Sequence, residues 1–243
     1  MVKPPAPNPI DAPGTDELTW RGWPELERLP VADVAAWTSA VVVAAHPDDE
    51  VLGVGGTISL LAAAGARLRL ISITDGEASH PGIAEPAVLA RRRIAETGAA
   101  LRVLGAQETE VIRLRLPDTG LSGLEDDICR QLRDLADGFD VCLAPWASDV
   151  HADHEAAGRA SGRACQRTVF YPVWTWHWSF PGDPRVPWRR ALRVPLPPMT
   201  AARKRAAIGC FASQLETRTA ATGPVLPPAT VAHFTRAQEV LFR

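Results

Sequence analysis

The stretch AVVVAAHPDDE, residues 40–50, joins a short apolar, β-branched run to a group of one imidazole and three carboxylates. An apolar run of this length is typical of a strand that is buried on both faces of a parallel sheet. Burying the polar group without partners would cost much free energy, so its carboxylates require a cation, a metal or water. The stretch therefore predicts a central strand whose end leads directly into a functional loop.

On both sides of this stretch, short apolar runs alternate with longer helical patterns. We expect strands at 68–73, 111–114 and 141–144, and helices at 55–64, 86–104, 124–135 and from about residue 154. Gly65 and Gly105 stand where two of these helices should end. This alternation predicts an α/β fold, with a Rossmann-like parallel sheet as the middle of three layers.

Composition separates an arm and a cap from the core of the chain. Residues 1–15 contain five prolines and predict a flexible Pro-rich arm. Residues 16–243 are expected to form a single domain, with a catalytic core over about 38–168. Residues 169–200 hold four of the eight Trp and seven of the 22 Pro, so we expect a Trp/Pro-rich C-terminal cap over about 169–243.

Charge and hydropathy exclude several classes of partner. The 26 basic and 28 acidic residues give a net charge of −2, without the basic footprint of a nucleic-acid-binding protein. No apolar stretch approaches the roughly 18–20 residues of a membrane span, and the N-terminus lacks the apolar segment of a secretory signal. The four cysteines form no CxxC pair and are expected to be reduced and buried. These features predict a cytoplasmic protein that binds neither nucleic acid nor membrane.

A second polar group, His151-Ala152-Asp153-His154, follows the fourth predicted strand. Because ligands collect at the carboxyl ends of parallel strands, this group should meet residues 46–50 at one edge of the sheet. Histidine and aspartate together suit Zn²⁺, which binds such ligands at roughly 2.0–2.2 Å. A catalytic zinc lowers the pKa of water to about 7 and polarises a carbonyl, and a nearby free carboxylate can act as general base. The sequence therefore predicts a hydrolytic Zn²⁺ site, with Fe²⁺ as the alternative metal.

The paired motifs AHPDDE (45–50) and HADH (151–154) resemble those of the PIG-L/LmbE-like zinc-dependent de-N-acetylases, a family that includes the GlcNAc-PI de-N-acetylases. The resemblance spans about residues 38–165 and implies an LmbE-like fold. At matching positions it implies His46, Asp49 and His154 as the zinc ligands. It also implies a metal-dependent enzyme that hydrolyses a non-peptide carbon–nitrogen bond.

The resemblance also implies roles for residues that do not bind the metal. Asp48 would be the general base that takes a proton from water. His151 would stabilise the oxyanion or protonate the departing amine, and Asp153 would orient a histidine and fix its tautomer. Glu50 has no assigned role beyond a supporting carboxylate at the start of a helix.

Three further residues are candidates for substrate binding, each with a structural alternative. Arg93, in the segment Arg93-Ile94-Ala95-Glu96, would reach a substrate hydroxyl or phosphate, or form a structural salt bridge. Asp118 would contact a sugar hydroxyl or belong to a turn. Trp176 would stack on a sugar if residues 174–178 form a strand, since Trp174, Trp176 and Trp178 then share one face; the alternative is a strand that buries its indoles.

The predicted reaction is hydrolysis of an N-acyl bond, foremost N-acetyl, on an amino sugar or its conjugate. One alternative is an amidase that cleaves a larger acyl group from a thiol or sugar conjugate. Others are a metal-dependent phosphoesterase, disfavoured by the few basic residues, and a non-catalytic metal- or sugar-binding module. Asp48 argues against the last, because a binding module needs no general base. The expected partner is thus a small N-acylated molecule, and homo-oligomerisation is left open.

Overall fold

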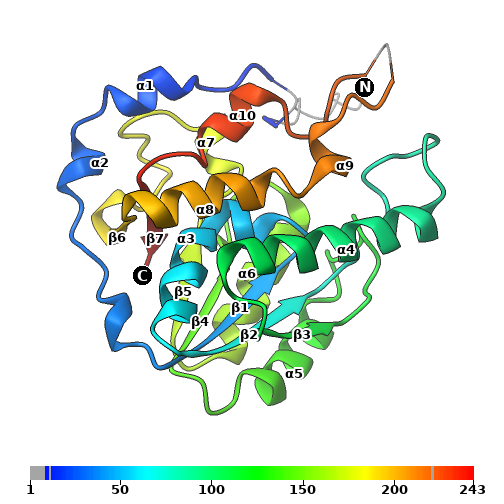
Figure 1. The fold of residues 1–243 in the computed structure, drawn as a ribbon, viewed down its shortest axis with the longest axis horizontal. Coiled ribbons are helices and arrows are strands. Elements are labelled where there is room, and N and C mark those ends of the chain that lie inside the picture. Colours follow the sequence, from blue (N-terminus) through cyan, green and yellow to red (C-terminus); the bar gives the residue numbers. More distant parts are fainter. Residues whose placement is uncertain (1–8, 11, 220–221) are drawn as a thin grey trace, which may run out of the picture.

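The computed structural model describes residues 9–10, 12–219 and 222–243, and β1 (Ser39–Ala44) lies inside its seven-stranded sheet (Figure 1). All six residues of β1 are buried, as expected for the apolar run. The strand order is β3-β2-β1-β4-β5-β7-β6. The strands that continue the parallel pairing from β1 are β2 (Arg67–Ser72), β3 (Glu110–Arg113), β4 (Val141–Pro145) and β5 (Thr168–Tyr171).

Helices cover both faces of the sheet. One face packs against α3 (Asp49–Ala63), α4 (Pro86–Leu104) and α8 (Pro198–Ile208), and the other against α5 (Glu125–Ala136) and α6 (Ala152–Ala164). Successive residues of β1 alternate between these cores: Val42 belongs to the first, and Val41 and Val43 belong to the second. The predicted three-layer α/β fold is therefore confirmed.

Residues 169–243 cover the sheet and also extend it. Strand β7 (Gln238–Phe242) pairs antiparallel with β5, and β6 (Ala191–Pro195) pairs antiparallel with β7, so the sheet is mixed rather than wholly parallel. The short elements outside the main layers are α1 (Glu17–Arg21), α2 (Glu25–Arg28), α7 (Thr175–Trp178), α9 (Ala212–Leu215), α10 (Pro228–Ala232) and 3₁₀ turns at Val34–Ala36 and Trp188–Arg190. Because one sheet unites both parts, we keep the single domain over 16–243, with its core and cap, as a proposal.

The predicted arm at residues 1–15 lies largely outside the described residues. Within the described part, Ala12 O accepts a hydrogen bond from His177 Nε2 at 2.9 Å. The backbone N–H of Thr15 donates to His177 O at 2.8 Å. Residues 12–15 are thus attached to α7.

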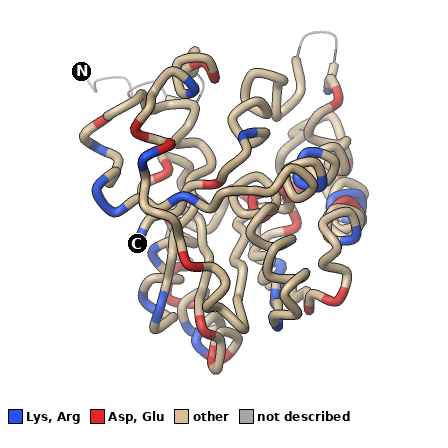
Figure 2. The backbone as a smooth tube through the Cα atoms, turned by 60° about the vertical axis from the view of Figure 1, so that its left-hand side comes forward, with Lys and Arg blue, Asp and Glu red and all other residues tan. Residues whose placement is uncertain are grey.

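The structure also shows how the charged residues and the cysteines are distributed. Figure 2 shows basic and acidic residues interspersed along the backbone, without one large region of a single sign. None of the helices that the structure describes is both long and apolar enough to span a membrane. The cysteines are free thiols: Cys129 and Cys142 are buried as predicted, whereas Cys165 and Cys210 are only half-buried.

Helix α3 differs from the expected helix at 55–64, because it begins at Asp49 and is interrupted at Val54 (φ −136°, ψ 21°). Beyond this break, the N–H groups of Gly56 and Thr57 donate to the carboxylate of Glu239 at 2.6 and 2.8 Å. Glu239 is buried and pairs with the equally buried Lys204 at 2.6 Å. Strand β7 and helix α8 thus together hold the second half of α3 in place.

Replacing Glu239 with Ala is expected to lower the free energy of unfolding by about 3–5 kcal/mol, because it leaves Lys204 as an unpaired buried charge. Urea unfolding followed by circular dichroism measures the change. The matched control is Glu110→Ala. Glu110 is the more exposed residue of its salt bridge with Arg69, so its loss should lower the free energy of unfolding by less than about 1 kcal/mol. Equal losses in the two variants would contradict a structural role for the Lys204–Glu239 pair.

Candidate active site

The two polar groups predicted to converge do meet at the carboxyl edge of the sheet. His46 lies in the loop after β1, Asp49 is the first residue of α3, and His154 lies in the first turn of α6, after β4. Asp49 Oδ2 is 3.5 Å from His46 Nδ1, and Asp49 Oδ1 is 3.2 Å from His154 Nε2. One carboxylate thus bridges two imidazoles, and all three side chains are buried.

A carboxylate also contacts the second ring nitrogen of each of these histidines. His46 Nε2 lies 3.2 Å from Asp153 Oδ2 and 3.3 Å from Asp118 Oδ1. His154 Nδ1 lies 2.8 Å from Asp149 Oδ2. A carboxylate on the outer nitrogen fixes the tautomer and the orientation of a metal-binding histidine. Both rings are therefore arranged as metal ligands usually are.

Asp48 is buried beside these residues and has an unusual backbone conformation, with φ 133°. Burial raises the pKa of its carboxyl to about 7, opposed mainly by the positive charge of Arg93. Arg93 Nη2 lies 3.2 Å from Asp48 Oδ2 and 2.6 Å from Pro47 O, and Nη1 donates to Gly76 O at 3.0 Å. Glu50 Oε2 accepts the N–H of Asp48 at 3.1 Å, which holds the loop from the other side.

His151 stands over the two bridged imidazoles. Its ring centroid is 4.9 Å from that of His46 and 4.6 Å from that of His154. Its Nδ1 is buried and has no hydrogen-bond partner within the described ranges of the chain. Burial, reinforced by the charges of the two neighbouring histidines, lowers its pKa to about 3, so the ring is neutral near pH 7. A neutral imidazole with a free buried nitrogen can bind a metal or a substrate atom.

The donor atoms present fit a divalent metal. The three histidines 46, 151 and 154 place ligand atoms within 4.8 Å of one another, and so do His46, Asp118 and Asp153. Imidazole nitrogen and carboxylate oxygen are the mixed donors that zinc accepts. The geometry therefore supports a metal centre that includes His46.

The cavity above this centre has a volume of about 250 Å³. It is lined by His46, Asp49, His151 and His154, together with Asp48, Arg93 and Asp118. Its apolar lining residues are Leu52, Val173, Trp174, Val225 and Leu226. Its other polar lining residues are Ser79, Thr119, Gln214 and Arg218. The cavity thus combines candidate metal ligands with apolar and polar side chains.

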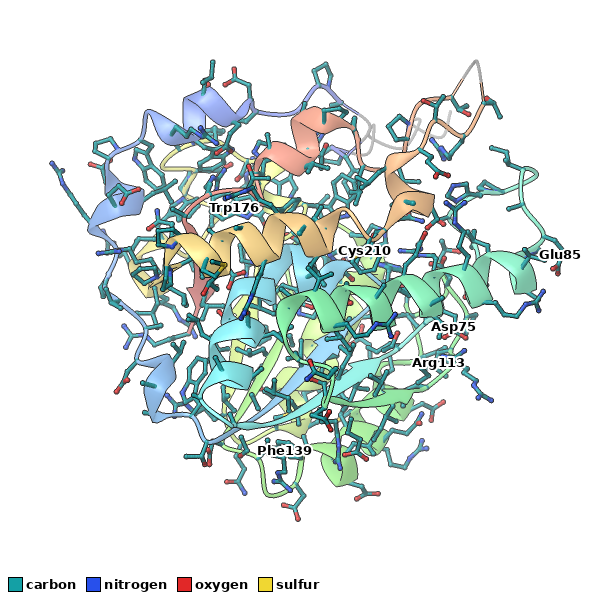
Figure 3. The ribbon with its side chains drawn as sticks, in the orientation of Figure 1. Asp75, Glu85, Arg113, Phe139, Trp176 and Cys210 are labelled. Carbon is teal, nitrogen blue, oxygen red and sulfur yellow. The ribbon has the colours of Figure 1, made fainter. Side chains whose placement is uncertain are left out.

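The structure corrects the expectation for Trp176. Residues 175–178 form helix α7 rather than a strand, so Trp174 and Trp176 do not share a face. Trp176, labelled in Figure 3, is buried, and its ring centroid lies 5.1 Å from that of Trp20 and 4.1 Å from the guanidinium of Arg236. It does not line the cavity; Trp174 does.

For the other two substrate candidates, the structure shows contacts within the protein. Arg93 forms the salt bridge that the sequence left as an alternative, and it also lines the cavity. Asp118 contacts His46 and accepts the N–H of Ala78 at 2.8 Å. Asp75, on the segment after β2, pairs with Arg113 at the edge of the sheet instead of facing the cavity (Figure 3).

Sequence reasoning missed Asp149, which is fully buried. Besides His154, its carboxylate accepts the backbone N–H groups of Trp174 and Thr175, both at 2.8 Å, and the hydroxyl of Thr175. These bonds start α7 as a helical turn, which is why the predicted strand is absent. The sequence did contain a signal for Asp149, because it lies only two residues before His151. A carboxylate buried next to such a polar group needs hydrogen-bond or ion-pair partners.

Comparisons with known proteins match this chain to a family model and to curated relatives. Residues 41–165, slightly more than half of the chain, match the family model PIG-L, GlcNAc-PI de-N-acetylase. The chain is 29% identical over 155 residues to 1D-myo-inositol 2-acetamido-2-deoxy-alpha-D-glucopyranoside deacetylase 2 of Catenulispora acidiphila, covering 53% of this chain and 51% of that protein. It is 33% identical over 137 residues to the uncharacterized deacetylase YaiS of Escherichia coli, covering 53% and 68%.

Among solved structures, N,N'-diacetylchitobiose deacetylase of Pyrococcus horikoshii superposes with a TM-score of 0.56 at 19% identity, covering 82% of this chain and 80% of that one. At this identity the likeness concerns the fold alone. The chain spans about half the length of the inositol-glycoside deacetylase that it matches.

Proposed function

The chain belongs to the GlcNAc-PI de-N-acetylase (PIG-L) family, and from this premise we propose that it is a metal-dependent deacetylase of amino sugars or amino-sugar conjugates. The observation that carries the proposal is the position of Asp48. This buried carboxylate lines the same cavity as His46, Asp49 and His154, and its salt bridge is to Arg93. A binding module would have no use for a general base there.

We propose His46, Asp49 and His154 as the metal ligands, with Asp153 and Asp149 orienting the two histidines. Zn²⁺ suits this donor set, with Fe²⁺ as the alternative. When bound, such an ion lowers the pKa of water and polarises the carbonyl of the substrate. Relatives with the same fold include a teicoplanin deacetylase described in a zinc-inhibited form, which supports zinc binding in this fold.

Asp48 is proposed as the general base. Its carboxylate takes a proton from water inside the cavity, and Arg93 keeps it oriented through the contact at 3.2 Å. His151 is proposed to donate a hydrogen bond to the oxygen of the attacked carbonyl. The alternative role, protonation of the departing amine, is disfavoured because the lowered pKa leaves this ring neutral near pH 7, so the amine would take the proton that Asp48 removed from water. The free Nδ1 of His151 and its place above His46 and His154 support the hydrogen-bonding role.

An acetyl group on an amino sugar suits the shape of the cavity. Its volume of about 250 Å³ lies at the small end of ligand sites, which favours acetyl over a larger acyl group. Trp174 offers an aromatic face to a sugar ring, and Ser79 and Gln214 offer hydrogen bonds to hydroxyls. The relative from Catenulispora acidiphila is named for an acetamido sugar linked to inositol, which supports the same class of substrate.

The experiment that tests this function is a substrate panel with the zinc-loaded chain. N-acetylglucosamine, its inositol glycoside and N-acylated thiol conjugates are incubated separately, and the free amine released is measured by fluorescamine. We expect amine release from the acetylated sugars, its loss on chelation and its return with added zinc. Release that survives chelation would contradict metal dependence, and binding without release would favour a non-catalytic module.

A further inference from the structure

A second cavity of about 220 Å³ adjoins the active-site cavity, and Arg218 lines both. Neighbouring residues of the chain line the two cavities. Ser79 and Gln214 line the active-site cavity, whereas His80 and Ser213 line the second one. A substrate that extends from the metal residues toward the second cavity would therefore meet Arg218.

Arg218 lines both cavities, and no carboxylate forms a salt bridge with it in the described part of the chain. It donates from Nε to Gly223 O at 2.9 Å. By contrast, Arg92 pairs with Glu216 at 2.8 Å and with Glu96 at 3.2 Å. Arg218 is half-buried and has no carboxylate partner among the described residues.

The surroundings of Arg218 combine positive charge with an apolar rim. Burial lowers the pKa of His80, and the positive charges of Arg218, Arg93 and Arg92 lower it further. Ile83 and Val88 line this cavity and are 44% and 52% exposed. Exposed apolar side chains beside a cation suit a carbon skeleton that carries an anionic group.

We propose that Arg218 is a specificity-determining residue that binds an oxyanion, carboxylate or phosphate, on the amine portion of the substrate. A planar guanidinium binds either group through two parallel hydrogen bonds. The acyl group then lies at the metal residues, and the anionic group lies where the two cavities join. This inference rests on the proposed function, because it takes the amine portion of the substrate to extend away from the metal residues.

The test measures binding of reaction products, which does not require hydrolysis. Isothermal titration calorimetry of the zinc-loaded chain compares glucosamine with glucosamine 6-phosphate, glucosamine 1-phosphate and muramic acid, which carries a carboxylate. Since hydrogen bonds to charged groups contribute about 1.5–3 kcal/mol, we expect at least one anionic product to bind about 10-fold more tightly than glucosamine. The phosphate and carboxylate probes then distinguish the two sources of the oxyanion.

Substitutions test whether Arg218 causes the preference for anionic products. Arg218→Met should reduce it to less than about 2-fold while leaving the affinity for glucosamine nearly unchanged, and Arg218→Lys should keep part of it. The control Arg203→Met removes an exposed arginine of α8 that lines neither cavity, and should keep the full preference. Thermal melts verify that each variant is folded.

Three results would overturn the proposal: no preference for an anionic product in the unaltered chain, the same preference in Arg218→Met, or no binding of any probe. Hydrolysis of N-acetylglucosamine without an anionic preference would remove this inference and leave the proposed function standing. An anionic preference without hydrolysis of any N-acetyl substrate would leave this inference standing and remove the proposed function.

Discussion

Asp48→Asn is expected to reduce the turnover of an N-acetyl substrate by about 100- to 10,000-fold while the zinc content stays unchanged, because a general base contributes that much to a hydrolysis. Asparagine keeps the size of the side chain and tolerates a positive φ, so the loop after β1 should keep its form. The change removes the proton acceptor and leaves His46, Asp49 and His154 in place. Steady-state kinetics together with metal analysis of the same sample measures both quantities.

A matched control separates this effect from a general loss of charge. Asp75→Asn makes the same substitution in a carboxylate that pairs with Arg113 and does not line the cavity. Its turnover should stay within about 2-fold of the unaltered chain, as is usual for substitutions away from the reacting groups. Unchanged turnover in Asp48→Asn would rule out Asp48 as the base.

His154→Ala is expected to abolish stoichiometric zinc binding and, with it, hydrolysis. His154 Nε2 approaches Asp49 at 3.2 Å, so its loss removes one of three proposed ligands and leaves Asp149 as a buried carboxylate without its histidine. Zinc content after dialysis, measured by mass spectrometry of the metal, gives the result. Circular dichroism shows whether the fold is kept.

Asp149→Asn should give an intermediate loss, about 10- to 100-fold in zinc affinity, because residues that orient a ligand typically contribute that much. His177→Ala is the control, since His177 contacts the backbone of Ala12 and does not line the cavity.

Full zinc occupancy in His154→Ala would contradict the proposed ligand set. It would point instead to His46, Asp118 and Asp153, whose donor atoms also cluster.

The sequence by itself determined the middle of this protein. The apolar run at 40–45, the helix at 86–104 and the glycine at its end depend on local preferences, and the structure has α4 over Pro86–Leu104 with Gly105 in the left-handed conformation. The meeting of His46 with His154 was also predictable. Parallel strands end at one edge of a sheet, so the residues that follow β1 and β4 must be neighbours.

Only the tertiary structure decided the rest, because the deciding interactions join residues far apart in the chain. Residues 174–178 become a helical turn since Asp149 accepts the N–H groups of Trp174 and Thr175, and this places Trp174, not Trp176, in the cavity. The break in α3 depends on Glu239, which lies more than 180 residues from Thr57. Such long-range partners leave no periodic pattern in the sequence, whereas the strand and the metal motifs do.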